Sequence, residues 1–448
     1  MTHYNKKIWR GNVRDAALSI LMDIENEQAF SNLLLHKTIE LYDLPQKDRA
    51  LLTELTYGTL QQQMTLDYYL APYIRGKLQP WVRQLLRLSV YQIVYLSKIP
   101  EHAVVNEAVK IANKRGHKGV SSMVNGILRS ILREGVPSLD EIKDPVTRLS
   151  IETSHPEWLI KRWIEQYGME EATAIAVINN LPPVTTARIN SVKTNRGEVI
   201  GLLKKEGVLA SPGNLTEGSI QVESGSLAST EAYKQGLLTV QDESSMLPAL
   251  ALQAEPGMKV LDMCAAPGGK TTHIAERMKD DGEVQAHDLH PHKLRLIEQN
   301  AKRLGLTSIQ THSGDSRELL STYEPQSFDR VLVDAPCSGL GVIRRKPEIK
   351  YKKTLQDIEN LASIQKDLLQ VASQLVKKGG RLVYSTCTID KTENQEIAEW
   401  FLNEQPDFEL VPLDILGEKS NREFVQVLPH QYESDGFFVV ALQRKTDL

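Results

Sequence analysis

The sequence predicts a multidomain protein that consists of an all-α N-terminal domain, a small α+β middle module and a C-terminal α/β domain. Three patterns predict this fold class. Residues 8–135 carry apolar side chains at helical spacing, with almost no strand signal. Residues 145–243 mix short strand and helix patterns, and from residue 244 strands alternate with helices, as in a doubly wound parallel sheet. We therefore expect domains at 1–140, 145–243 and 244–448.

The composition is that of an ordinary globular protein, with 448 residues, 41% hydrophobic and 25% charged. No apolar stretch approaches the roughly 20 residues that span a bilayer, and no signal-peptide core follows Met1, so we expect no membrane partner and a cytoplasmic location. The three cysteines suggest neither a disulfide framework nor a zinc site, and we expect no metal. The net charge of −4 excludes a global basic field, so nucleic acid must be bound by local clusters. We expect a monomer.

The elements of the first domain follow from helical periodicity. One helix is indicated by apolar residues at the right spacing: Val13, Ala17, Ile20, Leu21 and Ile24. A more buried helix is predicted over residues 82–94, and two further helices over Val104–Ile111 and Val124–Leu132. Turn-forming residues over 135–145 mark the first boundary.

The remaining elements are shorter. In the middle module we predict Pro156–Tyr167 and Gly197–Lys205 as helices, and Thr185–Ile189 and Ser219–Val222 as strands. In the last domain we predict five strands, at Lys259–Met263, Glu283–His287, Ile309–His312, Arg330–Asp334 and Arg381–Tyr384. Helices lie between them, for example Thr271–Met278 and Lys293–Leu304. A final hairpin is predicted at the edge of the sheet, from Phe424–Leu428 and Phe437–Leu442.

A turn of small residues follows the first strand of the last domain: Cys264, Ala265, Ala266, Pro267, Gly268, Gly269 and Lys270. Such residues let a ligand approach the backbone where a helix begins. Both the G-x-G-x-x-G fingerprint and a complete P-loop are missing, which favours a nucleoside ligand with little phosphate, and S-adenosylmethionine fits. Asp288 and Asp315, which follow the next two strands, would bind the ribose hydroxyls and the adenine amino group. Either aspartate alone would be interpreted as a helix cap or turn residue.

Two thiols follow later strands, Cys337 in Asp334–Gly339 and Cys387 in Tyr384–Thr388. Ligands bind at the carboxyl ends of parallel strands, so we expect both thiols in one crevice beside Asp334. A thiolate that adds to C6 of cytosine makes C5 able to accept a methyl group, and Asp334 would assist at N3. Asp334 would also border the cofactor. Lys270 or the basic loop that follows Cys337 would favour the thiolate. Either cysteine alone is more often a small buried hydrophobe.

The basic loop over residues 341–353 contains two arginines, four lysines and one tyrosine. We expect it to hold phosphates around a base that has been extruded from its stack. A charge run without other signals is more often a solvated face.

Taken together, these motifs resemble the RNA cytosine-C5 methyltransferase family. The resemblance covers Ala265–Lys270, Asp288, Asp315, Asp334–Gly339, Ser385–Thr388 and Asp435–Phe438. It implies a Rossmann-like catalytic domain with S-adenosylmethionine as the cofactor. It also implies that Cys387 is the nucleophile and that Cys337 helps to release the product. DNA cytosine methylases use the proline-cysteine thiol instead, so the presence of both cysteines favours RNA.

The N-terminal domain resembles the NusB-like RNA-binding domain through Glu101–Val109 and Val124–Arg129. Its fusion to this catalytic domain is similar to bacterial small-subunit rRNA methyltransferases, which implies a cytosine of 16S ribosomal RNA, free or in a partly assembled subunit, as the substrate. Two other hypotheses stay open. One is an RNA-binding assembly or antitermination factor with a non-catalytic methylase scaffold, which would need none of Asp334, Cys337 and Cys387. The other is an amino-group methylase of protein or adenine, which would need no cysteine.

Overall fold

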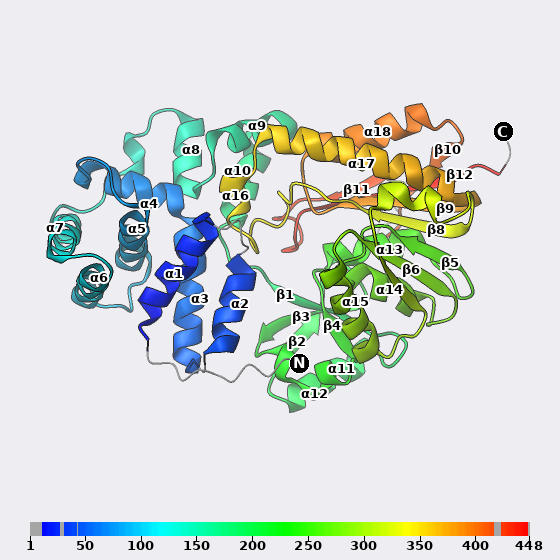
Figure 1. The fold of residues 1–448 in the computed structure, drawn as a ribbon, viewed down its shortest axis with the longest axis horizontal. Coiled ribbons are helices and arrows are strands. Elements are labelled where there is room, and N and C mark those ends of the chain that lie inside the picture. The colour runs from blue at the N-terminus through cyan, green and yellow to red at the C-terminus, as the bar shows by residue number, and fades with distance from the viewer. Residues whose placement is uncertain (1–10, 27–30, 43, 416–422, 447–448) are drawn as a thin grey trace. The chain divides into compact units, whose positions relative to one another are not determined.

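The structure is a computed structural model that describes residues 11–26, 31–42, 44–415 and 423–446. The chain divides into two compact units (Figure 1). The first contains Met1–Pro182 and Ile343–Lys352, and the second contains Pro183–Val342 and Lys353–Leu448. The domain boundaries that we drew from the sequence remain predictions. Within the described ranges, no helix is long and apolar enough to cross a membrane.

The first unit is helical, which confirms the all-α prediction. Its helices are α1 (Val13–Asn26), α2 (Ser31–Leu41), α3 (Gln46–Gln61), α4 (Gln63–Leu70), α5 (Pro80–Tyr95), α6 (Glu101–Arg115), α7 (Lys118–Glu134), α8 (Pro145–Thr153), α9 (Glu157–Tyr167), α10 (Met169–Ile178) and α16 (Ile349–Lys352). Pro80 stands at the start of α5, where its missing N–H has no helical partner to lose. Leu18, Leu52 and Leu86 are completely buried in the core of the bundle. Residues 8–10 of the predicted helical segment lie outside the described residues.

The segment 343–352 leaves the second unit and packs within the first. Lys350 and Arg344 are 0% and 3% exposed. The Lys350 Nζ donates to the carbonyl oxygen of Gln61 at 2.8 Å, and burial lowers the pKa of this amine. Arg344 donates to the carbonyl oxygen of Pro182 at 2.7 Å. The prediction that this loop grips phosphates is therefore wrong for Arg344 and Lys350, because both side chains are used inside the protein.

The second unit begins with a small antiparallel sheet in the order β2-β3-β1-β4. Its strands are β1 (Thr185–Ile189), β2 (Leu209–Pro212), β3 (Ser219–Ser224) and β4 (Leu238–Val240), and α11 (Arg196–Lys205) and α12 (Glu231–Lys234) accompany them. Ala187 and Ile220 of this sheet pack against Val199 and Leu203 of α11. The mixed α+β pattern predicted from the sequence is confirmed.

The large sheet follows, in the order β10-β12-β9-β8-β5-β6-β7, with β11 also paired to β12. Its strands are β5 (Lys259–Asp262), β6 (Glu283–Asp288), β7 (Ile309–Ser313), β8 (Phe328–Asp334), β9 (Val376–Thr386), β10 (Phe408–Leu410), β11 (Phe424–Val427) and β12 (Phe437–Arg444). The strands from β9 to β7 are parallel, as predicted. The predicted antiparallel pair of β11 and β12 also forms. Its predicted place at the edge is wrong for β12, which lies between β9 and β10 and is buried along most of its length.

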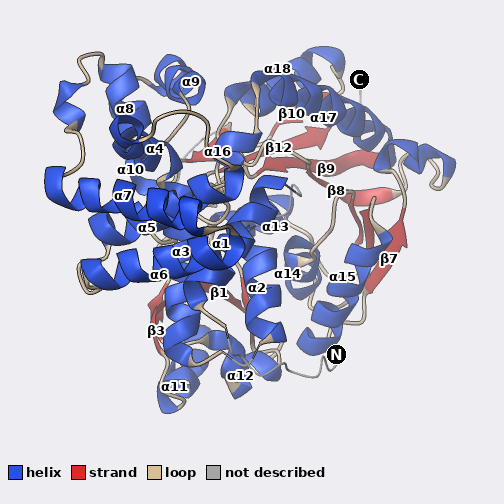
Figure 2. Cartoon of the chain, turned by 60° about the vertical axis from the view of Figure 1, so that its left-hand side comes forward, coloured by secondary structure: helices blue, strands red, loops and turns tan. Residues whose placement is uncertain are grey.

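Helices cover both faces of the large sheet (Figure 2). They are α13 (Leu247–Leu252), α14 (Gly269–Arg277), α15 (Pro291–Leu304), α17 (Leu355–Leu375) and α18 (Gln395–Glu404). Leu261 and Val331 belong to the core that includes residues of α17 and α18. Their neighbours Val260 and Leu332 belong to the core that includes residues of α13, α14 and α15. This alternation is the doubly wound arrangement that the sequence predicted.

Candidate active site

The structure brings Cys337 and Cys387 together. Strands β8 and β9 are parallel neighbours, and Asp334 is paired with Ser385 in their register. Each cysteine follows its strand by a few residues, so both leave the sheet at its carboxyl end. Their sulfur atoms lie 3.4 Å apart, and both side chains are half-buried. The two thiols thus share one place in the fold although 50 residues separate them in sequence.

Asp334 and Lys270 form an ion pair beside the thiols. The Lys270 Nζ lies 2.7 Å from Asp334 Oδ2, and the Ser385 hydroxyl donates to Asp334 Oδ1 at 2.9 Å. The ammonium also lies 5.0 Å from the ring centroid of Phe437. Burial lowers the pKa of Lys270, but Asp334 and the Cys387 thiol outweigh it and raise that pKa overall. A permanent positive charge therefore stands next to the strand ends. The sequence placed Lys270 and Asp334 at one site but did not indicate that they pair.

The surroundings of Cys337 shift the pKa of its thiol. The hydrogen bond with Cys387 raises the pKa of Cys337 well above its usual value, and burial and the nearby carboxylates of Glu393 and Asp334 add to the effect. Two thiolates in contact would repel each other, so the pair carries at most one negative charge near neutral pH. Burial and neighbouring carboxylates likewise raise the pKa of Cys264, which makes it an inert small side chain.

Glu393 lies beside the candidate site, and the sequence analysis did not single it out. Its carboxylate accepts the Ser338 N–H at 2.8 Å and also the Ser338 hydroxyl. Ser338 Oγ lies 2.8 Å from Thr388 Oγ1, so the residues that follow the two cysteines are linked. Gln365 donates to Glu393 Oε1 at 3.1 Å, and burial raises the pKa of the carboxyl group. A glutamate six residues after Cys387 gives no periodic signal that could have identified it.

The turn from Cys264 to Lys270 leads from β5 into α14. Gly268 has a φ of +100°, and a Cβ atom there would lie 3.0 Å from the Cα of Ile297 on α15. Glycine is therefore required both by the backbone angle and by the close approach of the neighbouring helix. The Ala266 N–H donates to Asp288 Oδ2 at 3.2 Å, which ties the turn to the end of β6.

The strand before the turn ends in a buried carboxyl group. Asp262 is fully buried, and the Thr271 hydroxyl donates to its Oδ2 at 2.7 Å. Burial raises the pKa of Asp262 to about 7. Asp262 and Thr271 were not predicted as site residues, because the sequence showed only an apolar strand and a helix start.

Asp288 and Asp315 end β6 and follow β7, next to the turn in the strand order. Asp288 Oδ1 accepts the N–H of His290 at 2.9 Å. Asp315 caps a short helical turn and pairs with Arg317 at 2.5 Å, and this arginine lowers the pKa of the carboxyl group. These are the local roles that we weighed for an isolated aspartate. Their proposed contacts with a cofactor remain predictions.

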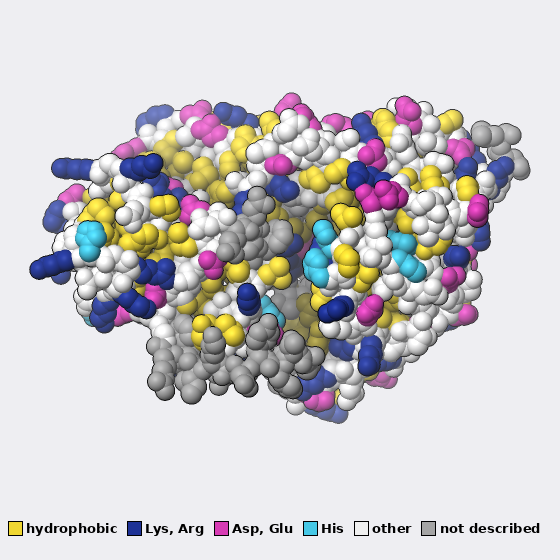
Figure 3. All heavy atoms as spheres, in the orientation of Figure 1, with side chains coloured by type: hydrophobic (Ala, Val, Ile, Leu, Met, Phe, Trp, Pro, Cys, Tyr) yellow, Lys and Arg dark blue, Asp and Glu magenta, His cyan; other side chains and the backbone are white. Residues whose placement is uncertain are grey.

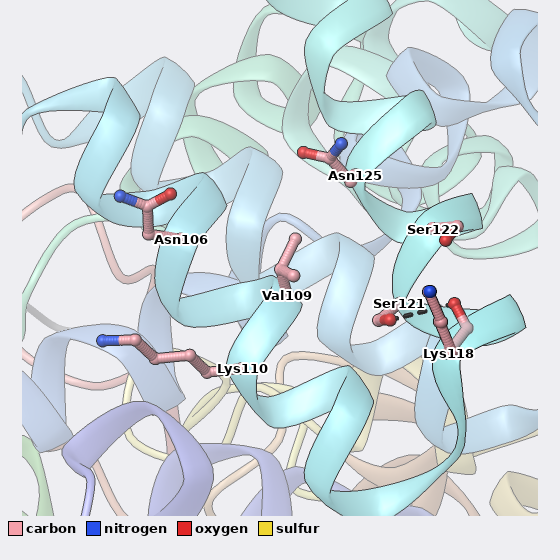
Figure 4. A pocket seen from close by; sticks show the side chains of 7 residues that line it. All are labelled: Asn106, Val109, Lys110, Lys118, Ser121, Ser122 and Asn125. Carbon is pink, nitrogen blue, oxygen red and sulfur yellow. Dashed lines mark hydrogen bonds between the residues drawn. The ribbon is translucent and has the colours of Figure 1, made fainter.

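A polar cavity of about 420 Å³ lies elsewhere, between α6 and α7 of the first unit (Figure 4). Its walls are formed by Asn106, Val109, Lys110, Lys118, Ser121, Ser122 and Asn125. Lysine and arginine side chains stand out on the surface of this helical region (Figure 3). The residues predicted for catalysis and cofactor binding do not line this cavity. Among the described residues, no cluster of His, Cys, Asp and Glu has the arrangement of a metal site.

A doubly wound sheet with a glycine turn after its first parallel strand and acidic residues at the next strand ends defines a Rossmann-like nucleotide-binding domain, a class that includes many methyltransferases. Comparison with known proteins narrows this class. Residues 249–443 match the family described as 16S rRNA methyltransferase RsmB/F, residues 11–133 match the NusB family, and residues 155–227 match the ferredoxin-like domain of RsmF/B-like methyltransferases. The chain belongs to the RsmB/F family of 16S rRNA methyltransferases.

Individual relatives span nearly the whole chain. The probable ribosomal RNA small subunit methyltransferase B of Bacillus subtilis is 51% identical over 97% of this chain and 99% of its own length. The corresponding methyltransferase B of Pseudomonas syringae is 34% identical over 96% of both chains. The crystal structure of PH0851 superposes with a TM-score of 0.84 at 27% identity, covering 98% of this chain and 100% of that one.

Proposed function

We propose that this chain methylates C5 of a cytosine in 16S ribosomal RNA, with S-adenosylmethionine as the methyl donor and Cys387 as the nucleophile. The observation that carries the proposal is the 3.4 Å separation of the Cys337 and Cys387 sulfur atoms beside the ion pair of Lys270 and Asp334. An amino-group methylase needs no thiol at this place, whereas addition to C6 of a pyrimidine needs one. The family membership supports ribosomal RNA as the substrate class.

The turn after β5 fits a nucleoside cofactor. Three adjacent strands end at the proposed cofactor site. They lead to Gly268, whose backbone lies close to α15, and to the carboxylates of Asp288 and Asp315. The residues that would hold the cofactor are Cys264, Ala265, Ala266, Pro267, Gly268, Gly269, Lys270, Asp288, Asp315 and Asp334. When bound, S-adenosylmethionine supplies an electrophilic methyl group on its sulfonium. The absence of a full phosphate nest agrees with a ligand that carries no phosphate.

Each of these side chains has a separate role at the cytosine ring. The Lys270 ammonium stabilises negative charge and therefore favours the Cys387 thiolate, whose sulfur forms the bond to C6. The Asp334 carboxylate accepts a hydrogen bond from N3 when N3 carries a proton, which makes the ring more electrophilic. Because the two sulfur atoms are in contact, only one thiol of the pair ionises readily, and we assign the thiolate to Cys387 and the remaining proton to Cys337. After methyl transfer, a base takes the C5 proton, the electron pair of the C5–H bond re-forms the C5–C6 double bond, and the C6–S bond breaks to return the Cys387 thiolate; we assign Cys337 to assisting this release step.

Substitution of the two cysteines tests the proposal. Cys387→Ala should abolish methyl transfer from labelled S-adenosylmethionine to 16S rRNA, because the sulfur that activates C5 is gone. Cys337→Ala should accumulate a covalent protein–RNA species that migrates slowly on a denaturing gel. A Cys387→Ala protein that methylates C5 at the normal rate would refute the assignment of the nucleophile.

Calorimetry with S-adenosylmethionine distinguishes the enzyme from a non-catalytic RNA-binding scaffold. We expect the wild-type chain and Cys387→Ala to bind the cofactor with the same affinity, because Cys387 is not part of the cofactor turn. If neither protein binds S-adenosylmethionine, the scaffold hypothesis is favoured instead.

A further inference from the structure

We propose that Arg188, on β1 of the small antiparallel sheet, is a positioning residue for the cofactor turn of the large sheet. The inference rests on the proposed function, since it assumes that the turn binds S-adenosylmethionine. It assigns the small sheet a part in cofactor affinity, although none of its residues was predicted for the site.

The contacts of Arg188 join the start of α14 to its third turn. Its Nη1 donates to the carbonyl oxygen of Gly269 at 2.8 Å, and its Nη2 donates to Thr272 Oγ1 at 3.1 Å. Its Nε and Nη2 lie 2.8 and 2.9 Å from the two oxygens of Glu276. Gly269 and Glu276 are seven residues apart and therefore lie on the same face of the helix. One planar guanidinium thus fixes both the orientation of α14 and the glycine that begins it.

The burial of this pair indicates a specific role. Arg188 and Glu276 side chains are 2% and 1% exposed. A buried ion pair contributes little stability relative to apolar side chains of similar volume, because both charges lose their hydration. What this ion pair supplies is a fixed geometry, because the two parallel hydrogen bonds from the guanidinium to the carboxylate allow only one relative orientation of the two groups. Gln241, which follows β4, accepts a further bond from the same Nη1.

Other residues hold the remaining sides of the turn. Asp288 accepts the N–H of Ala266, and Ile297 packs against Gly268. Both belong to the large sheet or its helices. Arg188 approaches from the small sheet and holds the Gly269 carbonyl group. When Arg188 is removed, we expect the C-terminal end of the turn, next to Lys270, to become mobile. Cys337 and Cys387 should stay in place.

The test compares S-adenosylmethionine binding in three variants of the full chain. Arg188→Met combined with Glu276→Met removes the bond to Gly269 without leaving an unpaired buried charge. Arg188→Lys keeps the charge but loses the fork. Arg303→Lys is the matched control, because Arg303 donates to the carbonyl oxygens of Tyr233 and Leu238 and so holds the small sheet, but has no bond to the turn.

We expect the dissociation constant for S-adenosylmethionine to rise about tenfold in both Arg188 variants, because the free turn then adopts the binding-competent arrangement only about a tenth of the time. The KM for RNA and the kcat at saturating cofactor should stay within about twofold of wild type, which a general loss of structure would not produce. Equal cofactor affinity in wild type and in the folded Arg188 variants would overturn the inference, as would the same tenfold shift in Arg303→Lys. If the wild-type chain itself does not bind the cofactor, the proposed function fails and the inference fails with it.

Discussion

At the scale of single residues, the contact between Cys337 and Cys387 has a consequence for the oxidised protein. Their sulfur atoms lie 3.4 Å apart, whereas a disulfide bond is about 2.0 Å long. We expect mild hydrogen peroxide to join them, with one peroxide taking a hydrogen from each thiol and leaving as two molecules of water. Methylation should be lost and then restored by dithiothreitol. Peptide mapping by mass spectrometry would identify the bond.

The third cysteine serves as an internal control for this prediction. Cys264 should remain a free thiol, because Cys337 and Cys387 are already in contact with each other. A bond between Cys264 and either partner, or a fully active oxidised protein, would contradict the expected pairing.

Asp262 should make stability depend on pH. Its pKa rises from an ordinary 3.8 to about 7 in the folded chain, because the carboxyl group is fully buried. Between these values the folded state binds a proton that the unfolded state has released, so this group's contribution to stability falls as pH rises from about 4 to about 7. Above about 7 the contribution is constant.

Asp262→Asn removes that titration and still accepts a hydrogen bond from Thr271. In urea unfolding, the free energy of unfolding of the variant relative to that of wild type should be higher at about pH 8 than at about pH 5. A difference in unfolding free energy that is the same at both pH values would show that Asp262 does not titrate in this range.

At the scale of elements, a close contact between loops holds Cys387, the proposed nucleophile. Gly341 donates its N–H to the carbonyl oxygen of Cys387 at 3.0 Å, and its own carbonyl group accepts the N–H of Gly436 at 2.8 Å. A Cβ atom on Gly341 would lie 2.0 Å from the Gly436 oxygen and 2.7 Å from the Cys387 oxygen. Gly341→Ala should therefore displace the Cys387 loop and lower kcat by at least about tenfold, as misplacement of reacting groups does.

Gly126→Ala provides the matched control. Gly126 lies inside α7, and a Cβ atom there would meet nothing within 4 Å. Alanine should raise the free energy of unfolding by about 0.5–1 kcal/mol through helix propensity and leave methylation unchanged. Equal activity in both alanine variants would show that the Gly341 contact does not position the thiol.

The elements themselves were predictable where a local pattern was sufficient. The strand Thr185–Ile189 was predicted with its observed bounds, and α15 differs from its prediction by two residues at the start. The place of β12 inside the sheet was not predictable, because it depends on pairing with β10, which carries only three residues. Glu393 was missed for a related reason. Its role comes from Ser338, 55 residues earlier, and no local pattern records such a contact.

At the scale of the whole molecule, the chain order differs from the order of the compact units. Residues 343–352 follow the Cys337 loop in sequence but belong to the first unit. Tyr351 donates to the carbonyl oxygen of Leu60 at 3.0 Å, and Glu348 accepts both the N–H and the hydroxyl of Ser31. The sequence suggested an exposed basic loop because lysine and arginine are rarely buried. Composition alone could not reveal that Lys350 bonds the carbonyl group of Gln61, 289 residues earlier, and that Arg344 bonds that of Pro182, 162 residues earlier.

Because residues 343–352 belong to the first unit, a chain that lacks the rest of that unit should behave abnormally. A fragment of residues 183–448 would keep 343–352 but lose its partners, which exposes Ile343 and Ile349 and removes the acceptors of Lys350. Exposed apolar surface promotes association, so we expect this fragment to aggregate and to melt without a sharp transition. Replacing 343–352 by a glycine-serine linker of equal length should restore a soluble monomer that binds S-adenosylmethionine, since the turn and its contacts lie within the second unit. Light scattering and thermal unfolding measure the difference, and a plain fragment as soluble as the linker version would show that the segment folds without the first unit.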